Sequence, residues 1–194
     1  LNYCPNCWHV QIAEKLSPEI LFKDYAWQTG ISKSNISLIN SLSRKLEKYQ
    51  INKNSKVLEI ASNDGSLIKF IQKKYKSFIV GVDPAKNLVN NIKKNLITIS
   101  DFFSYKLSKK IKKKFLNFNF IIARNVIAHV KSPNDIFKGV FNLLKKNGIF
   151  IVEVPHLYSI IKENQYDNIF HEHLGFHSLK SLVDLCDKNN LQLF

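Results

Sequence analysis

From residue 56 onward, short apolar runs alternate with stretches in which apolar residues recur at helical spacing. Short apolar runs bounded by turn residues are typical of buried strands, and the intervening patterns are typical of amphipathic helices. This alternation places the strands in a mostly parallel sheet with helices on both faces. We expect strands at 56–62, 77–83, 119–126 and 149–155, with another beginning at 191–194. We expect helices at 32–51, 65–75, 84–94, 132–148 and 178–190.

The chain has 194 residues, of which 45% are hydrophobic, and this is enough for one domain with its own core. Its apolar runs fall well short of the roughly 20 residues that a membrane span requires, and no secretory signal is visible. Three cysteines cannot form a full disulfide framework, which favours a reducing, cytoplasmic setting. Because the sequence has no Met and opens on Leu1, we expect a piece of a longer protein.

The formal net charge of +14 raises one alternative, a lysine-rich α/β domain that binds nucleic acid. Only Arg44 and Arg124 among the 29 basic residues are arginines, whereas phosphate and base readers favour the guanidinium fork. The lysines accompany many Asn and Ile residues, and the densest run, at 106–114, is typical of a solvated helix or loop face. The composition therefore favours a small molecule over nucleic acid as the partner.

The stretch 57–67, VLEIASNDGSL, carries the most information about a ligand. It predicts an apolar strand, a small polar turn that contains Gly65, and the start of a helix. Open α/β sheets bind ligands outside the carboxyl ends of their strands, and small residues let the backbone approach a ligand closely. The turn has a single glycine and matches neither of the glycine-rich phosphate-binding patterns. Glu59 and Asp64 would repel a pyrophosphate and suit a cationic or amine-bearing ligand.

Acidic residues also follow the next two apolar segments. Asp83 ends the second expected strand, where an acid accepts hydrogen bonds from a ribose diol in nucleotide-binding sheets. Asp101 and Phe102 follow a third short apolar segment and would supply an acid for an adenine amino group and an aromatic wall. The alternative is that both acids are turn or cap residues. Together with Glu59, at three successive strand ends, they favour a nucleoside ligand without phosphates.

Several segments together resemble the class I S-adenosylmethionine-dependent methyltransferases, which have a Rossmann-like α/β fold. These segments are VLEIASNDGSL, GVDPAKN, SDFF, ARNVIAHV and FIVEVP. More specifically, SNDG, NVIAHV and YDNIFHEH resemble the bacterial sugar C-methyltransferases, which act on nucleotide-linked keto-deoxysugars. That family has two more strands and a C-terminal domain, so the resemblance implies a chain truncated at both ends. An inactive fragment is therefore a further alternative.

The resemblance implies S-adenosyl-L-methionine as the cofactor and assigns residues to its parts. The methionine part would lie against the turn from Glu59 to Gly65, with Asp64 or the neighbouring backbone near its amine. Asp83 would bind the ribose, and the wall beside the sulfonium would include His129, unless that residue is a structural histidine. The cofactor-binding residues implied in this way are Glu59, Ser62, Asn63, Asp64, Gly65, Asp83, Asp101, Phe102, Asn125 and Val126.

Residues 166–178, YDNIFHEHLGFHS, hold three of the six histidines. They do not match the His-Glu-x-x-His pattern of metalloproteases, because Glu172 lies directly between His171 and His173. His173 and His177 are four residues apart, but no third metal ligand is evident. Acid/base chemistry fits better. Methylation of carbon requires removal of a proton beside a carbonyl, and histidine titrates near working pH.

In the resembled family this stretch lines the sugar pocket. The resemblance implies His173 as the base, Glu172 as the group that orients it or bonds the sugar, and His171 beside them. One position departs from the family, which commonly has Tyr where this chain has Phe170; Tyr166 lies four residues earlier. Either the sugar is recognised differently, or the enzyme is an O- or N-methyltransferase that acts on a small metabolite.

Near its start the chain carries Cys4 and Cys7, at the spacing that supplies half of a tetrahedral zinc site. The remaining ligands would lie upstream or include His9. The segments CPNCWHVQI and PEILFKDYAW resemble the end of the family's zinc-binding module and the segment after it, which implies zinc in the full-length protein. The implied division is a zinc-module remnant at 1–14, a helical linker or lid at 15–50 and the methyltransferase core at 51–194.

Three further side chains can be interpreted as packing residues, and two of them also as part of the site. Tyr25 and Trp27 either form an aromatic lid over the site or pack without a further role. Cys186 shares a helical face with Leu182 and Val183, so we expect it to be a buried small hydrophobic residue.

Overall fold

The computed structural model describes residues 1–14, 16–22, 24–92 and 95–194. The larger of its two sheets has the strand order β5-β4-β3-β6-β7, and every pairing in it is parallel. This confirms the predicted Rossmann-like α/β fold with a parallel sheet. Its strands are β3 (Lys56–Ile60), β4 (Phe78–Val82), β5 (Ile97–Ile99), β6 (Phe118–Arg124) and β7 (Leu144–Glu153).

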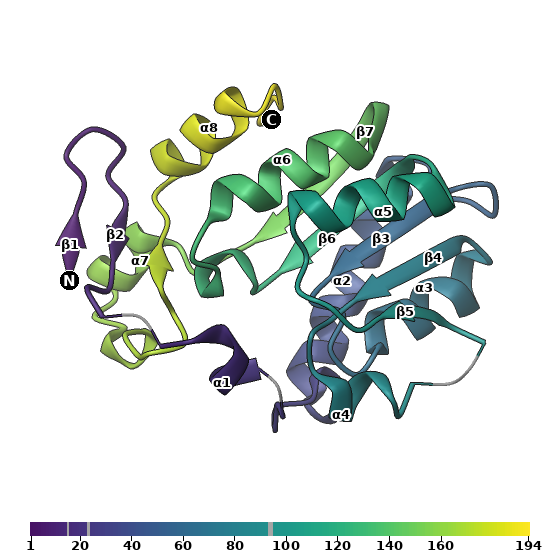
Figure 1. Cartoon of the computed structure of the whole chain (residues 1–194), viewed down its shortest axis with the longest axis horizontal. Coiled ribbons are helices and arrows are strands. Elements are labelled where there is room, and N and C mark those ends of the chain that lie inside the picture. Colours follow the sequence, from purple (N-terminus) through teal and green to yellow (C-terminus); the bar gives the residue numbers. More distant parts are fainter. Residues whose placement is uncertain (15, 23, 93–94) are drawn as a thin grey trace.

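Helices cover both faces of this sheet, and Figure 1 shows α5 and α6 in front of it with α2 and α3 behind. Side chains alternate between the faces along each strand. Leu58 and Ile60 join the core that includes α5, α6 and α8, whereas Val57 joins the core that includes α2 and α3. The main helices are α2 (Lys33–Lys48), α3 (Ser66–Tyr75), α5 (Tyr105–Phe115), α6 (Pro133–Leu143) and α8 (Leu179–Lys188). Shorter ones are α1 (Pro18–Phe22), η1 (Thr29–Ile31), α4 (Lys86–Val89), η2 (Ile127–His129), α7 (Leu157–Lys162) and η3 (Tyr166–Asn168).

The second sheet joins the start of the chain to the segment that follows η3. It pairs β1 (Asn2–Tyr3), β2 (Val10–Gln11) and β8 (Gly175–Phe176) in antiparallel order. The Ile12 N–H extends this pairing by donating to the Leu174 carbonyl at 3.1 Å. The beginning of the chain is therefore held against the segment that contains the predicted catalytic histidines, beside the large sheet (Figure 1).

Three predicted elements differ from the structure. The helix expected at 132–148 ends at Leu143, because Leu144 already pairs with Phe118 in the sheet; a register shift follows before Ile149 pairs with Phe120. No strand forms at 191–194, where the Leu191 N–H donates to the Cys186 carbonyl and ends α8. The helix expected at 84–94 is regular only over Lys86–Val89, and residues 93–94 lie outside the described residues.

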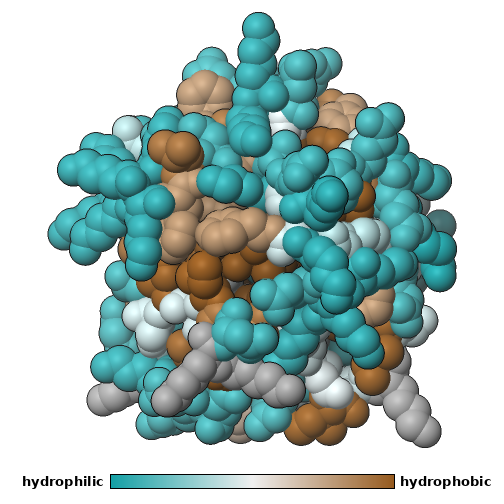
Figure 2. All heavy atoms as spheres, turned by 90° about the vertical axis from the view of Figure 1, so that its right-hand side faces the viewer, coloured by the Kyte–Doolittle hydropathy of each residue, from teal (hydrophilic) through white to brown (hydrophobic). Residues whose placement is uncertain are grey.

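The lysine run at 106–114 forms the solvated face of α5, as expected. Leu107, Ile111 and Phe115 turn inward, while most of the lysines are exposed. Figure 2 shows a face of the molecule on which hydrophilic side chains surround a smaller apolar area. Cys186 is buried in the core beside Leu182, which confirms its predicted role. Within the described part of the chain, no helix is long and apolar enough to span a membrane.

Candidate functional site

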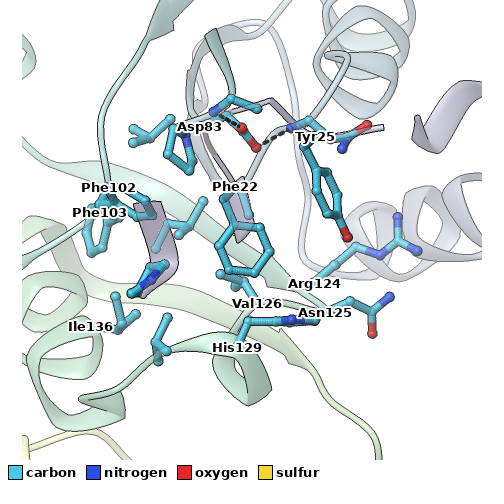
Figure 3. A pocket seen from close by; sticks show the side chains of 18 of the residues that line it. Phe22, Tyr25, Asp83, Phe102, Phe103, Arg124, Asn125, Val126, His129 and Ile136 are labelled. Carbon is cyan, nitrogen blue, oxygen red and sulfur yellow. Dashed lines mark hydrogen bonds between the residues drawn. The ribbon is translucent and has the colours of Figure 1, made fainter. Parts of the chain in front are cut away.

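A cavity of about 550 Å³ opens at the carboxyl ends of β3, β4 and β6, where an open α/β sheet is expected to bind its ligand. Its volume lies within the roughly 300–1,000 Å³ range of small-molecule sites. Figure 3 shows Phe102, Phe103 and Ile136 at one side, Arg124 and Tyr25 at the other, and Asp83 between them. The predicted cofactor residues that line it are Glu59, Asn63, Asp83, Phe102, Asn125 and Val126. The predicted residues outside its lining are Ser62, Asp64, Gly65 and Asp101.

The turn after β3 is built from left-handed backbone conformations. Ala61, Asn63 and Gly65 have φ values of 59°, 52° and 73°. At Gly65, which precedes α3, a side chain would be strained at this φ and would meet Ile92 at 3.1 Å. The Ser62 N–H donates to the Val82 carbonyl at 3.1 Å, which ties the turn to the end of the neighbouring strand. The chain thereby turns away sharply after β3, and the cavity lies at the carboxyl end of this strand.

The turn also holds an N-terminal segment, residues 24–31, which we call the strap. The Gly30 N–H donates to Asp64 Oδ2 at 2.9 Å, and the Thr29 N–H donates to Asn63 Oδ1 at 2.8 Å. The Asn63 amide donates in turn to the Trp27 carbonyl at 3.0 Å. The other oxygen of Asp64 accepts bonds from Ser66. Asp64 therefore has bonding partners within the protein, in the strap and in α3.

Glu59 is the most unusual acid in the cavity wall. Its side chain is buried, and Oε2 has no hydrogen-bond partner among the described residues. Burial raises the pKa of this carboxyl well above its ordinary value, and the nearby Arg124 opposes that shift. A buried carboxylate oxygen without a partner is costly unless a ligand satisfies it. The ammonium group of an amino acid fits this position chemically.

Asp83 lies at the end of β4 and is also buried. Its two oxygens accept the Asn63 N–H and the Ala85 N–H, each at 2.8 Å. Burial raises its pKa, and these backbone bonds oppose the shift. Asp83 therefore supports the turn, as the alternative interpretation held, and it also faces the cavity. Each carboxylate oxygen can accept a second hydrogen bond, so the support of the turn leaves capacity for a diol.

The two residues expected around an adenine ring differ in position. Asp101 is exposed and its Oδ1 accepts the Phe102 N–H at 2.8 Å, so it caps its own turn. Phe102 lines the cavity and is 37% exposed, whereas Phe103 is buried beneath it. This end of the cavity therefore offers an aromatic surface, with Val126 also in the lining.

Arg124 was not predicted as a site residue. It ends β6 directly opposite Glu153 at the end of β7, and its side chain is 9% exposed. Its Nε donates to Glu153 Oε2 at 3.0 Å and its Nη2 donates to Oε1 at 3.3 Å. The same carboxylate accepts a bond from the Asn125 amide at 3.2 Å. A signal in the sequence was the presence of an arginine at a strand end in a chain whose cations are almost all lysine.

His173 lies behind the cavity wall rather than in it. Its Nδ1 lies 2.8 Å from the Asn168 carbonyl, which can only accept, so Nδ1 is the donor in this bond. The ring packs against Phe170, with 4.3 Å between centroids, and against His129, with 4.8 Å. His129 lines the cavity, and burial, followed by the neighbouring His173, lowers its pKa to about 4. His129 is therefore neutral at neutral pH.

Glu172 and His171 flank this imidazole and differ in surroundings. The Tyr25 hydroxyl of the strap donates to Glu172 Oε2 at 3.2 Å. Burial and the Glu172 charge raise the pKa of Tyr25 to about 12, so the hydroxyl keeps its proton. His171 is exposed. None of the three predicted catalytic residues lines the cavity itself, but His129 and Tyr25, which do, connect His173 and Glu172 to it.

The N-terminal cysteines lie in a turn between β1 and β2. Hydrogen bonds from the Cys7 backbone and thiol lower the pKa of Cys4, whereas burial raises that of Cys7. Across the described ranges, no three His, Cys, Asp or Glu side chains gather as a metal site. The spacing of the two thiols matches half of a structural zinc site, and zinc binding stays a prediction for a longer chain.

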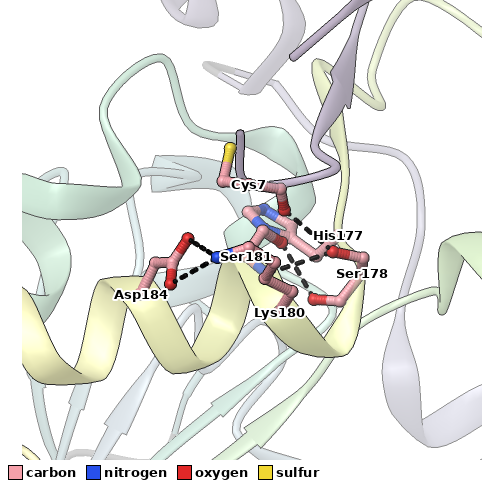
Figure 4. A network of polar contacts seen from close by, with 6 residues as sticks. All are labelled: Cys7, His177, Ser178, Lys180, Ser181 and Asp184. Atoms are coloured by element: carbon pink, nitrogen blue, oxygen red, sulfur yellow. Dashed lines mark hydrogen bonds and ion pairs between the residues drawn. The ribbon is translucent and has the colours of Figure 1, made fainter. Parts of the chain in front are cut away.

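The same turn is attached to the histidine-rich segment. The Ser178 hydroxyl donates to the Cys7 carbonyl at 3.1 Å (Figure 4). The His177 ring also packs at a tilt against His9, with 4.5 Å between the ring centroids. His177 is buried, and burial lowers its pKa to about 4. His177 is therefore a structural residue of this contact and does not face the cavity.

The parallel sheet, the turn after β3 and the acids that follow β3 and β4 define a methyltransferase. The family model for the methyltransferase domain matches residues 31–194, and the chain belongs to this family. Enzymes of this class take their methyl group from S-adenosyl-L-methionine. The cavity fits that cofactor chemically, because its lining includes the Glu59 carboxyl, whose Oε2 has no partner among the described residues, the carboxyl of Asp83 and the aromatic ring of Phe102.

Among curated proteins, the chain is similar to the C-methyltransferase NovU of Streptomyces niveus, with 30% identity over 98% of the chain and 46% of NovU. It is also similar to phosphoethanolamine N-methyltransferase of Plasmodium falciparum, with 26% identity over 66% of the chain and 48% of that protein. The chain thus spans about half the length of the curated relatives it matches.

Two solved structures share the fold. A SAM-dependent methyltransferase from Archaeoglobus fulgidus aligns with a TM-score of 0.60 and 14% identity over 78% of this chain and 68% of that chain. Phosphoethanolamine N-methyltransferase 2 of Haemonchus contortus, solved with S-adenosyl-L-methionine, aligns with a TM-score of 0.55 and 15% identity over 77% of this chain and 36% of that one.

Proposed function

We propose that this domain transfers a methyl group from S-adenosyl-L-methionine to a carbon atom of a nucleotide-linked keto-deoxysugar in the cytoplasm. The similarity to a C-methyltransferase over nearly the whole chain supports carbon as the acceptor. The observation that carries the proposal is the hydrogen bond between the His173 ring and the Asn168 carbonyl. The His173 Nδ1 proton is committed to the Asn168 carbonyl, which leaves Nε2 as a base within ring contact of the cavity wall.

In the proposed reaction, His173 Nε2 removes the proton from the carbon beside the sugar ketone and so generates an enolate. The bound cofactor supplies an electrophilic methyl group on a sulfonium. A neutral His129 places no positive charge beside His173, so the imidazole can accept the proton without like-charge repulsion. Glu172 stands beside the charged imidazolium and is oriented by the Tyr25 hydroxyl.

The cofactor would lie along the cavity with its adenine at Phe102, its ribose at Asp83 and its ammonium group at Glu59. Asn125 and Val126 would flank the sulfonium, and the turn at 62–65 would shape this wall through its backbone. Because Asp64 and the Asn63 amide already bond the strap, we assign the ammonium group to Glu59 rather than to Asp64.

The cofactor part of the proposal is tested by calorimetric titration with S-adenosylhomocysteine. Binding by the parent and its loss in Asp83→Ala are expected. Failure of the parent to bind at high micromolar concentrations would contradict the proposal. The acceptor part is tested with a nucleoside-diphosphate keto-deoxysugar deuterated beside its carbonyl. If His173→Asn exchanges the label as fast as the parent, another group is the base.

A second candidate is methyl transfer to oxygen or nitrogen of a small metabolite. Phe170 favours it, because a phenyl ring cannot donate a hydrogen bond to a ketone, and a phosphoethanolamine N-methyltransferase is among the relatives. Such an acceptor requires no carbon-bound proton to be removed. Methyl transfer without any solvent exchange at carbon would identify this alternative.

A further inference from the structure

The cationic side chain at the end of β6 has no assigned role in the site described so far. The cofactor carries a zwitterionic amino-acid group, so a site that selects it must satisfy a carboxylate as well as an ammonium. Glu59 provides the negative partner. Among the described residues, the Arg and Lys side chains that line the cavity are Arg124 and Lys131.

Arg124 and Lys131 differ in where they lie and in which acid their charge acts on. Figure 3 shows Arg124 at the side of the cavity opposite Phe102, with Asp83 between them. Arg124 lies near enough to Glu59 to oppose the rise in that residue's pKa. Lys131 is exposed, and its charge acts on Glu19 of α1. Among the described residues that line the cavity, Arg124 is therefore the cation whose charge acts on Glu59.

The bonding of Arg124 leaves capacity for a ligand. Of the five N–H donors of a guanidinium, Glu153 engages two, one at Nε and one at Nη2. These two bonds occupy the Nε–Nη2 edge of the planar guanidinium. The N–H donors of the Nη1–Nη2 edge still match the geometry of a second carboxylate. Because the side chain is 9% exposed, water screens such an interaction only weakly.

We propose that Arg124, oriented by Glu153, binds the carboxylate of the cofactor's amino-acid group and so makes this domain select a cofactor with an intact carboxylate. The inference rests on the proposed use of S-adenosyl-L-methionine. Arg124 and Glu59 then form a pair of opposite charges matched to the two charges of the ligand. Glu153 is a positioning residue, since it acts through Arg124.

The test compares three ligands by calorimetric titration: S-adenosylhomocysteine, its decarboxylated analogue, and methylthioadenosine, which lacks the whole amino-acid group. The parent is expected to bind S-adenosylhomocysteine about tenfold or more tightly than the decarboxylated analogue. Arg124→Gln is expected to abolish that preference while it binds methylthioadenosine as the parent does. Arg44→Gln, which changes the other arginine, exposed on α2, is the matched control and should keep the preference.

Arg124→Lys and Glu153→Gln sharpen the result. Lysine keeps the charge but loses the fork, so an intermediate preference is expected, and Glu153→Gln should weaken the preference without changing methylthioadenosine binding. The proposal is overturned if Arg124→Gln keeps the parent's preference, if it weakens all three ligands equally, or if Lys131→Gln abolishes the preference instead. Absence of S-adenosylhomocysteine binding in the parent would instead remove the proposed cofactor itself.

Discussion

The turn after β3 and the segment at 166–177 lie at the same end of the large sheet, yet different contacts hold them. The turn is fixed by its own strand, by the neighbouring β4 and by buried acids. The segment at 166–177 has only short helical and strand pieces and is held by β2, the strap and ring contacts. The proposed cofactor region is therefore held by the large sheet, whereas the proposed acid/base region depends on contacts with residues from the start of the chain.

If the two regions have separate tasks, the largest effect should come from the base. We expect His173→Asn to slow proton exchange at the sugar carbon by roughly 100- to 10,000-fold. The affinity for S-adenosylhomocysteine should stay within about twofold, because His173 does not line the cavity. Isotope exchange followed by NMR and calorimetry measure the two quantities. His156→Asn, at an exposed histidine, is the control. A comparable loss of cofactor affinity would show that the regions are not separate.

The converse experiment changes the turn. Asp83→Ala removes the acceptor for two backbone N–H groups and for the ribose, so we expect S-adenosylhomocysteine to bind about 100-fold more weakly. Exchange at saturating cofactor should recover most of its rate. Asp187→Ala, an exposed acid on α8, should leave the affinity unchanged. Unaltered affinity in Asp83→Ala would remove the ribose assignment.

The strap contacts both regions, and little space surrounds Gly30 for a side chain. A side chain there would lie 2.4 Å from Ser66 Oγ and 2.8 Å from Asp64 Oδ2, so Gly30→Ala must displace either the strap or these two side chains, which bond to each other and to the strap. We expect a loss of about 1–3 kcal/mol in the free energy of unfolding, measured in urea. Both cofactor affinity and exchange rate should fall. Gln28→Ala, at an exposed strap position, should change neither.

Replacing Glu59 should affect cofactor affinity and folding stability in opposite directions. Its pKa is raised in the folded state, so the folded state holds this proton more tightly than the unfolded chain does. Stability is therefore lost as pH rises from the ordinary value of 4.5 to the raised one. We expect Glu59→Gln to remove this loss and to be more stable than the parent at pH 8 by about 1 kcal/mol or more, with weaker S-adenosylhomocysteine binding. Thermal unfolding between pH 5 and pH 8 tests the sign, with exposed Glu14→Gln as the control. Equal pH dependence in parent and variant would contradict it.

The smallest expected effect concerns the bond between the strap and the base region. Tyr25→Phe removes the hydrogen bond to Glu172 and keeps the ring. The free energy of that bond, about 1 kcal/mol, would no longer hold Glu172 in position. We expect an approximately fivefold slower exchange with little change in cofactor affinity. Tyr3→Phe, at an exposed tyrosine, is the control. A loss as large as that of His173→Asn would instead indicate that the hydroxyl acts on the substrate.

Local patterns in the sequence predicted the parts of the site that neighbouring residues build. The turn at 61–65 and Asp83 each follow an apolar strand. The point at which the apolar run ends in the sequence therefore predicts where each of them lies. The strap was not predictable in this way, and the signal for Arg124 was only that it is an arginine in a lysine-rich chain. The bond between Gly30 and Asp64 spans 34 residues and that between Tyr25 and Glu172 spans 147, so only the fold brings these groups together.

The error at 132–148 has a similar cause. The helical pattern continues past Leu143, but the pairing of Leu144 with Phe118 in the sheet takes precedence over local preference. The same reasoning explains why 191–194 is not a strand, since a strand requires a partner edge that the local sequence does not reveal.

The close fit of Gly30 against Asp64 and Ser66 has a consequence for how this domain can change over generations. A larger residue at position 30 is tolerated only if the side chains at 64 and 66 become smaller or move. These three positions should therefore vary together among related sequences, although they belong to different predicted segments. Cofactor turn and strap would then be inherited as one unit, while the histidine-rich segment diversifies with the acceptor.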